Sequence, residues 1–200
     1  RGLHRLLRFG LPNGIRADIA DTEMFSLMQQ AGFYFINVAI ESGDQGVLDQ
    51  LGKKLDLGQV HQTVTTLVNM GFRVGILFMM GLPFDTPESL AKTARLAASL
   101  PAHHAYLSLV TPFPGTRLYD LALAQGPVAR YDETAGLNYD REGPRFYSTT
   151  MPDALVRRSL RRAYRQFYFN PWRVWHIVRT VLRQGAWASD FWFMFKNGIR

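Results

Sequence analysis

Apolar segments of this sequence alternate with segments of helical periodicity, and this alternation limits the possible folds more than any other feature. The apolar segments cover residues 6–18, 34–40, 72–83 and 104–116, and the helical ones cover residues 21–32, 56–71, 86–100 and 116–126. Near-continuous apolar strands are typical of a parallel sheet that is covered by helices. The sequence therefore predicts an α/β fold with a parallel sheet.

Several turn and cap signals support these boundaries. Gly32, Gly71 and Gly126 follow the helical segments directly, where glycine commonly ends a helix. Thr86 is suited to the N-cap of its helix, with Pro87 at the first helical position. In the first apolar segment, Pro12-Asn13-Gly14 is expected to end the strand in a polar loop.

Ligands of parallel α/β folds bind beyond the carboxyl ends of the strands. The candidate residues are therefore those that follow each apolar segment. They are Arg16-Ala17-Asp18, Glu41-Ser42-Gly43, Gly81-Leu82-Pro83 and Thr111 to Gly115.

Glu41 is the strongest single candidate, because a carboxylate that closes a buried strand must be hydrogen-bonded or solvated. It could cap the helix that begins near Asp44, pair with a nearby Lys or Arg, or bind a ligand. A carboxylate beside Ser42 would suit a ligand with vicinal hydroxyls, such as a ribose. The residues alone leave these alternatives open.

The other strand ends are also ambiguous when taken singly. Arg16 could hold an anionic ligand group as a fork, or form a surface ion pair. Gly81-Leu82-Pro83 and Pro112 to Gly115 are turn sequences, which also let a flat group approach the backbone. His61, His103 and His104 form no metal-ligand pattern with carboxylates, so we interpret them as structural or solvent-facing.

Composition excludes some chemistry and divides the chain. The chain has no cysteine, which excludes disulfides, a thiol nucleophile and a thiolate-held metal within it. No secretory signal or membrane-length apolar run is present, which favours a cytoplasmic location. Residues 1–150 carry 13 Lys/Arg and 14 Asp/Glu, whereas residues 151–200 carry 10 Lys/Arg and 2 Asp. A nearly neutral body thus precedes a basic, tryptophan-containing extension.

The extension is predicted to form two helices that are interrupted before Pro171. The first places Arg157, Arg158, Arg161, Arg162 and Arg165 on one face, and Val156, Leu160, Ala163, Tyr164 and Phe167 on the other. The second places Val174, Ile177, Val178, Val181 and Leu182 opposite Arg173, Arg179 and Arg183. The apolar faces could pack on the body with solvated arginines, the helices could lie on a membrane surface, or the basic surface could bind RNA. Nucleic acid is the least favoured, because the charge follows helix faces.

Taken in chain order, four segments resemble the radical S-adenosylmethionine superfamily, and within it the cobalamin-binding subgroup of ester cyclases and radical methyltransferases. The segments are PNGIRAD, MQQAGFYFINVAIESGDQGVLDQLGKKL, GILFMMGLPFDTPESLAKTARLA and TPFPGTRLYD, which together span roughly residues 8–124. The resemblance implies the C-terminal part of a partial parallel (β/α)6 TIM-like barrel over residues 1–126. A connecting loop over 127–150 and a helical basic-aromatic C-terminal extension over 151–200 would follow.

The resemblance also implies a site. It assigns Glu41 and Ser42 to the ribose hydroxyls of S-adenosylmethionine. The backbone around Met80, Gly81 and Pro83 would contact the adenine, and Val110 to Pro112 would close the adenine pocket. Arg16 would lie near the methionine carboxylate or the substrate.

This sequence departs from the family pattern in two ways. The CxxxCxxC loop that holds the [4Fe–4S] cluster is missing, so the cluster ligands, two barrel strands and any cobalamin domain are expected upstream of Arg1. The common Gly-x-Pro-Gly-Glu-Thr turn reads here Gly81-Leu82-Pro83-Phe84-Asp85-Thr86. A shorter acid at Asp85 puts in doubt any ligand contact that the longer glutamate makes.

We therefore expect the C-terminal portion of a radical enzyme that modifies an unactivated carbon, by cobalamin-dependent methyl transfer or oxidative cyclisation, and that is inactive as this fragment alone. Its substrate would be a small molecule, a lipid or a tetrapyrrole. A noncatalytic membrane- or partner-binding module and an RNA-modifying radical enzyme are the alternatives. The oligomeric state is not predicted.

Overall fold

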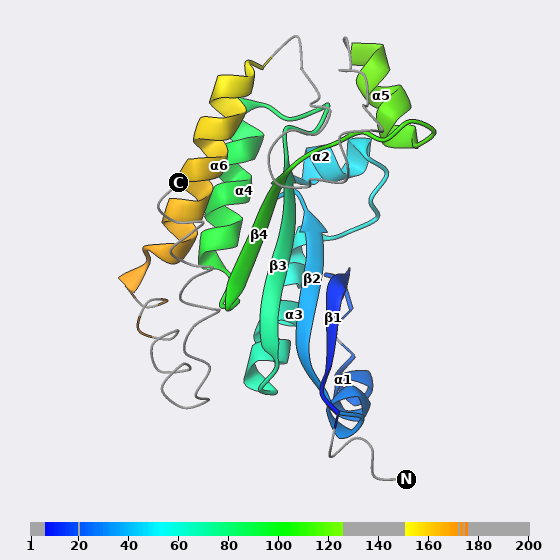
Figure 1. Cartoon of the computed structure of the whole chain (residues 1–200), viewed down its shortest axis with the longest axis vertical. Coiled ribbons are helices and arrows are strands. Elements are labelled where there is room, and N and C mark those ends of the chain that lie inside the picture. Colours follow the sequence, from blue (N-terminus) through cyan, green and yellow to red (C-terminus); the bar gives the residue numbers. More distant parts are fainter. Residues whose placement is uncertain (1–6, 20, 126–150, 172, 174, 176–200) are drawn as a thin grey trace.

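The computed structural model describes residues 7–19, 21–125, 151–171, 173 and 175. Its centre is a four-stranded parallel sheet (Figure 1) made of β1 (Phe9–Arg16), β2 (Phe33–Glu41), β3 (Arg73–Met80) and β4 (His104–Leu109). The strands lie side by side in chain order, as successive units of a parallel barrel do. The predicted α/β class and parallel sheet are confirmed.

Helices follow the strands as the alternation predicted. They are α1 (Thr22–Gln30), α2 (Gln45–Gln50), α3 (Leu57–Asn69), α4 (Pro87–Ser99), α5 (Arg117–Gln125) and α6 (Asp153–Tyr168). Asp21, Asp44 and Asp56 cap α1, α2 and α3, because each side chain accepts a hydrogen bond from a first-turn N–H. Thr86 caps α4 as predicted, in a reciprocal capping box with Ser89.

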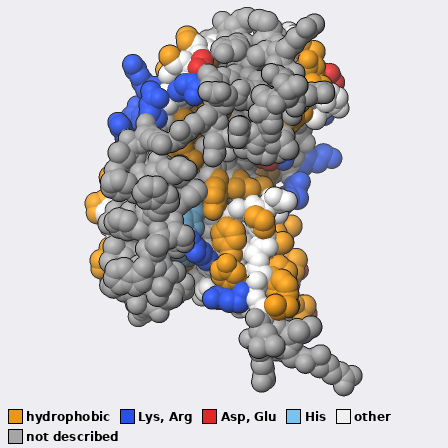
Figure 2. All heavy atoms as spheres, in the orientation of Figure 1, with side chains coloured by type: hydrophobic (Ala, Val, Ile, Leu, Met, Phe, Trp, Pro, Cys, Tyr) orange, Lys and Arg blue, Asp and Glu red, His pale blue; other side chains and the backbone are white. Residues whose placement is uncertain are grey.

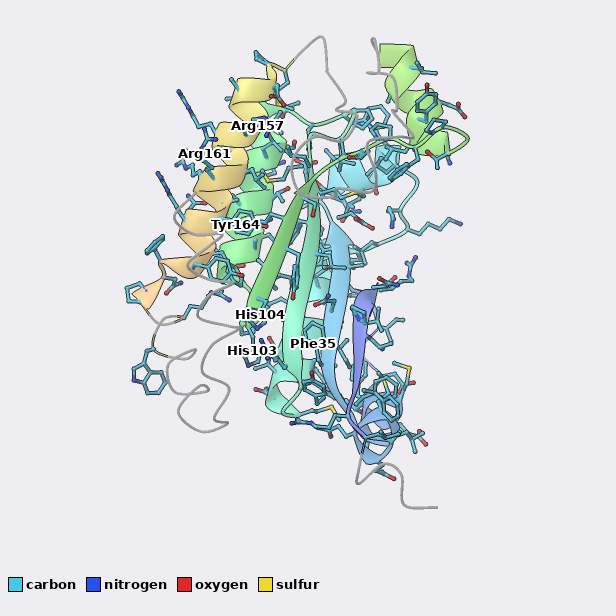
Figure 3. All side chains as sticks on the ribbon, viewed as in Figure 1. Phe35, His103, His104, Arg157, Arg161 and Tyr164 are labelled. Atoms are coloured by element: carbon cyan, nitrogen blue, oxygen red, sulfur yellow. The ribbon has the colours of Figure 1, made fainter. Side chains whose placement is uncertain are left out.

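One face of the sheet packs on the helices and forms the main core. Alternate strand residues such as Ile36, Val38, Val74 and Ile76 are fully buried there. The opposite face carries the intervening residues, several of which are half-buried, and Figure 2 shows hydrophobic side chains on the part of it that is in view. Phe35 projects from this open face of β2 (Figure 3).

The prediction that Pro12-Asn13-Gly14 ends the first strand is wrong. β1 continues to Arg16, and residues 12–14 form a bulge opposite Asn37 of β2. Gly14 accommodates the bulge with φ 83°, and the Asn37 amide donates a hydrogen bond of 2.6 Å to the Pro12 carbonyl. Proline is tolerated because β1 is the edge strand among the described residues, so its missing N–H costs no sheet hydrogen bond.

α6 packs its apolar face on α4 and β4, which confirms the packing alternative for this helix. Val156, Ala163 and Phe167 are buried, whereas Arg158 and Arg161 on the opposite face are exposed. The amphipathic pattern of α6 is therefore accounted for by the core. No side-chain hydrogen bond from the described residues caps α6, whose N-cap position is Pro152.

The tyrosines of α6 pair with the edge of β4. The Tyr164 hydroxyl donates to the Leu107 carbonyl (2.9 Å) and accepts from the Leu107 N–H (3.1 Å). Tyr168 makes the same pair of bonds with Ala105, at 3.4 and 3.3 Å. The two hydroxyls form hydrogen bonds with the β4 backbone N–H and C=O groups that a further strand would need, so no strand of the described residues pairs with this edge at Ala105 and Leu107.

Arg173 is buried, contrary to the predicted solvent-facing position on the second helix. Its side chain is only 2% exposed and lies over the Phe167 ring, with 3.6 Å between the guanidinium carbon and the ring centroid. It donates hydrogen bonds to the carbonyls of Ala98, Leu100 and Ala102 at the C-terminal end of α4. A buried cation is stable here because those carbonyls carry the partial negative charge of the helix end.

Burial lowers the pKa of Arg173 to about 10, and the neighbouring Tyr168 opposes that shift. Other residues predicted for the second helix, including Val174, Ile177 and Arg179, lie outside the described residues, as does the connecting loop over 127–150. The three domain boundaries therefore remain predictions.

Candidate functional site

The carboxyl ends of β2, β3 and β4 meet at one edge of the sheet, as the parallel arrangement requires. A small hydrophobic cluster of Val47, Leu82 and Val110 joins the segments there, with Leu118 of α5 packed against it. The Val110 N–H also donates to the Met80 carbonyl at 2.9 Å. The structure thus brings the turns after β3 and β4 together beside α2.

Glu41 lies at this edge in a strained backbone conformation. Its φ is +73°, the one positive value among described non-glycine residues. A register shift precedes it in β2, and the Ser42 N–H donates to the Ile40 carbonyl to close a tight turn. A left-handed glutamate costs on the order of 1 kcal/mol, and such strain concentrates at functional sites.

The Glu41 carboxylate forms an ion pair with Lys53, with 2.8 Å between Oε1 and Nζ. The glutamate side chain is 16% exposed and the lysine 45%, so the pair contributes at most about 1 kcal/mol. Asp44, not Glu41, caps α2. Of the three alternatives, capping is therefore wrong and pairing is observed, while Oε2 has no hydrogen-bond partner within the described residues.

Ser42 and Gly43 continue the turn and attach it to α4. Ser42 is buried, and its hydroxyl accepts a hydrogen bond of 3.2 Å from the Asp44 N–H. The Gly43 N–H donates to the Thr93 hydroxyl at 2.9 Å. A Cβ at Gly43 would lie 2.5 Å from Thr93 Cα, so only glycine allows this approach of loop and helix.

Asp85 organises the turn after β3. One of its oxygens accepts hydrogen bonds from the Gly81 and Leu82 N–H groups, both at 2.9 Å, and the other accepts from the Ser89 hydroxyl at 2.7 Å. Gly81 has φ +82°. The short acid at this position is thus bonded within the turn itself, and the Gly81 N–H is not free for a ligand.

Burial raises the pKa of Asp85 above its usual value, and the negative charge of Asp44 adds to that effect. The hydrogen bonds from Ser89 and from the Leu82 and Gly81 amides act in the opposite direction. The remaining predicted residues of this turn, Met80 and Pro83, are buried.

The segment after β4 offers little polar chemistry. Val110 and Pro112 are buried, and Thr111 is half-buried. The Val110 side chain lies near Gly81, where an added Cβ would sit 3.9 Å from Val110 Cγ1. Gly81, Pro83, Val110 and Pro112 therefore form an apolar and buried part of this edge.

Arg16, at the end of β1, forms the surface ion pair that the sequence left open. Its guanidinium forks onto Asp18 at 3.0 and 2.6 Å and donates to the Lys54 carbonyl at 2.6 Å. This pairing lowers the pKa of Asp18. Lys53 and Lys54 are adjacent, so one short segment contacts both Glu41 and Arg16.

Sequence reasoning missed Lys53, Thr93 and the role of Asp85. Lys53 lies just after α2, a six-residue helix that ends at Gln50. The available signal was the short distance in sequence between this lysine and the end of β2. Within the described ranges, no group of three or more His, Asp or Glu could hold a metal ion. No helix among the described residues has the length and apolar content to cross a bilayer.

A parallel sheet with its strands in chain order, helices between them and the turns at their carboxyl ends gathered at one edge is an α/β fold of the barrel type. Residues 9–97 match the family model of the radical SAM superfamily. The expected family is therefore confirmed.

Two relatives extend the match. An uncharacterized methyltransferase of Pyrococcus horikoshii is 26% identical over 156 residues, covering 78% of this chain and 33% of that protein. The anaerobic magnesium-protoporphyrin IX monomethyl ester cyclase of Cereibacter sphaeroides is 26% identical over 183 residues, covering 86% of this chain and 28% of that enzyme. This chain thus spans about a third or less of each relative.

Among solved structures, the radical SAM enzyme coproporphyrinogen III oxidase of Escherichia coli is similar with a TM-score of 0.49 and 18% identity. The likeness covers 54% of this chain and 24% of that enzyme.

Proposed function

We propose that this chain forms one wall of an S-adenosylmethionine site in a radical enzyme. The observation that carries the proposal is the strained Glu41, which closes a strand at the edge where the apolar turns after β3 and β4 also meet. The ends of β2 and β3 at that edge lie within residues 9–97, which match the family model of the radical SAM superfamily.

The residues fit the ligand in part. Glu41 would accept hydrogen bonds from the ribose hydroxyls, since Oε2 has no hydrogen-bond partner among the described residues and Lys53 holds Oε1 in place. Gly81, Pro83, Val110 and Pro112 would lie against the adenine as an apolar surface, although all four are buried in this structure. Ser42 is a poorer fit, because it is buried and its oxygen already accepts a bond from Asp44.

The chain has no cysteine, so a [4Fe–4S] cluster would need ligands from another segment. When bound, the cluster and S-adenosylmethionine would supply a 5′-deoxyadenosyl radical that abstracts hydrogen from an unactivated carbon. Residues of this chain would orient the nucleoside and exclude water from it. Cobalamin, if the enzyme uses it, would bind outside the described residues.

The open sheet face favours a substrate with a large apolar body. Leu77 and Tyr106 lie on this face in register with Ala39, and Phe35 lies on the same face further towards the start of β2. A small molecule, lipid or tetrapyrrole of this kind would undergo methyl transfer or oxidative cyclisation, the reactions that the relatives' names contain. The packing of α6 on the core gives no support to a membrane-bound or RNA-binding role for that helix.

The test is anaerobic reconstitution of the full-length protein with iron and sulfide, followed by reduction in the presence of S-adenosylmethionine. We expect 5′-deoxyadenosine from the full-length protein and none from residues 1–200 alone. A product from residues 1–200 would contradict the need for an outside cluster. A full-length protein without a CxxxCxxC motif, and without S-adenosylmethionine binding, would favour a noncatalytic binding module.

A further inference from the structure

A groove lies between the C-terminal ends of α4 and α6, which run side by side in Figure 1. It is shallow and widely open to solvent, with a volume of about 530 Å³. Arg95 and Ser99 line it from α4, and Arg165, Gln166, Phe169 and Asn170 line it from α6 and the residues after it. We propose that this groove binds the phosphate group of an organic ligand.

The lining is positively charged without compensation. Arg95 and Arg165 are both exposed, and neither guanidinium forms a hydrogen bond or ion pair with the described residues. Within the part of the chain that the structure describes, no acidic side chain lines the groove. Two guanidinium forks facing one space suit a phosphate, which accepts paired hydrogen bonds from arginine.

Arg173 removes the electrostatic obstacle to such an anion. The end of α4 would otherwise present partly negative carbonyls near the groove. Arg173 binds the carbonyls of Ala98, Leu100 and Ala102, so it offsets that charge from the buried side. The arrangement leaves Arg95 and Arg165 to act on the solvent side.

Gln166 adds a polar group to the same wall. Its amide oxygen is buried without a hydrogen-bond partner, and an amide group also carries two N–H donors. Phe169 is 61% exposed at the rim and offers apolar surface to the body of the ligand. The groove therefore combines cationic, amide and aromatic groups.

The groove is separate from the strand-end site. α4 begins at Pro87, next to the Gly81 turn, and Arg95 and Ser99 lie roughly 12–18 Å further along its axis, at 1.5 Å per residue. The groove can therefore bind a phosphate whether or not the strand-end site binds S-adenosylmethionine.

The test compares matched double variants of the full-length protein in calorimetric titrations with inorganic phosphate and with phenyl phosphate. Arg95→Ala/Arg165→Ala removes the groove cations. Arg158→Ala/Arg161→Ala makes the same charge change on the exposed face of α6, where Arg161 points away from α4 (Figure 3). We expect the groove variant to lose about tenfold or more in affinity and the control to change little.

A second arm uses co-sedimentation with phosphatidylcholine vesicles that contain phosphatidic acid. Binding to vesicles through Arg95 and Arg165 would identify a lipid headgroup as the source of the phosphate, and binding to phenyl phosphate alone would identify a soluble ligand. Arg95→Lys/Arg165→Lys should bind with intermediate affinity, since it keeps the charge and loses the forks. Equal losses in both alanine variants, or no binding of any probe by the unmodified protein, would overturn the proposal.

Discussion

The Tyr164 hydroxyl makes two hydrogen bonds with Leu107, donating to its carbonyl at 2.9 Å and accepting from its N–H at 3.1 Å. A side chain of α6 thereby replaces a neighbouring strand at the edge of β4. Tyr168 makes the same pair of hydrogen bonds with Ala105, two residues before Leu107 in β4, and the Tyr164 and Tyr168 rings are stacked. The C-terminal extension is therefore part of the sheet's own hydrogen bonding as well as of its core.

Tyr164→Phe and Tyr168→Phe should each lower the free energy of unfolding by about 1–3 kcal/mol, because each leaves backbone groups of β4 without a partner. Denaturant unfolding measures the change. Tyr119→Phe in α5 is the control, since its hydroxyl forms no hydrogen bond with the described residues, and we expect a change of less than about 0.5 kcal/mol. Equal effects in all three variants would mean that the edge contacts do not stabilise β4.

Arg173→Met should destabilise the protein by about 2–4 kcal/mol, because three carbonyls at the end of α4 would lose charge-assisted hydrogen bonds. Thermal and denaturant unfolding would report the loss. Arg158→Met is the matched control on the exposed face of α6 and should have little effect. A stability unchanged by Arg173→Met would show that the guanidinium is not needed to end α4.

Asp85→Asn should alter how stability depends on pH. Burial raises the pKa of Asp85 above 3.8, so folding favours its protonated form. The contribution of Asp85 to the free energy of unfolding is complete below pH 3.8, and it declines as the pH rises through the raised pKa of the folded state. Relative to Asp85→Asn, the unmodified protein should thus lose stability with rising pH. Unfolding measured over this pH range tests the sign, and a difference that is flat or grows with pH would contradict it.

Gly43→Ala should lower the free energy of unfolding by about 1–3 kcal/mol, since the new Cβ would lie 2.5 Å from the backbone of Thr93. Gly46→Ala is the comparison in α2, where the nearest atom is Asp44 Oδ1 at 3.2 Å. That variant should be neutral or slightly stabilising because alanine favours helix. Loss of stability in Gly46→Ala alone would refute the predicted contact between the loop and α4.

The strands, the helices and the location of the candidate site followed from local patterns. Apolar runs, the Thr86-Pro87 start and the helix-ending glycines are short-range signals, and the parallel sheet then requires the strand ends to share one edge. The bulge at Pro12 was missed because Asn37, 25 residues away, holds it.

Pairing between distant side chains was the part that the sequence could not supply. Nothing local distinguishes Lys53 as the partner of Glu41, or Arg173 as the cap of α4 71–75 residues earlier. An arginine on a predicted helix face is ordinarily solvated, and its burial depends on which carbonyls the tertiary fold presents to it.

The central claim is that Glu41 binds S-adenosylmethionine, and Glu41→Gly in the full-length protein separates this role from a structural one. Glycine relieves the strain at φ +73° by about 1 kcal/mol, which offsets the loss of the exposed ion pair with Lys53. Lys53→Ala is the control, because it breaks the ion pair but keeps the carboxylate.

The decisive measurement is equilibrium binding of S-adenosylmethionine to these variants, alongside their unfolding. We predict that Glu41→Gly keeps its stability and loses about tenfold or more in affinity, consistent with loss of charged hydrogen bonds, while Lys53→Ala loses much less. Unchanged affinity in Glu41→Gly, together with reduced stability, would contradict the account and leave Glu41 as a structural ion-pair residue.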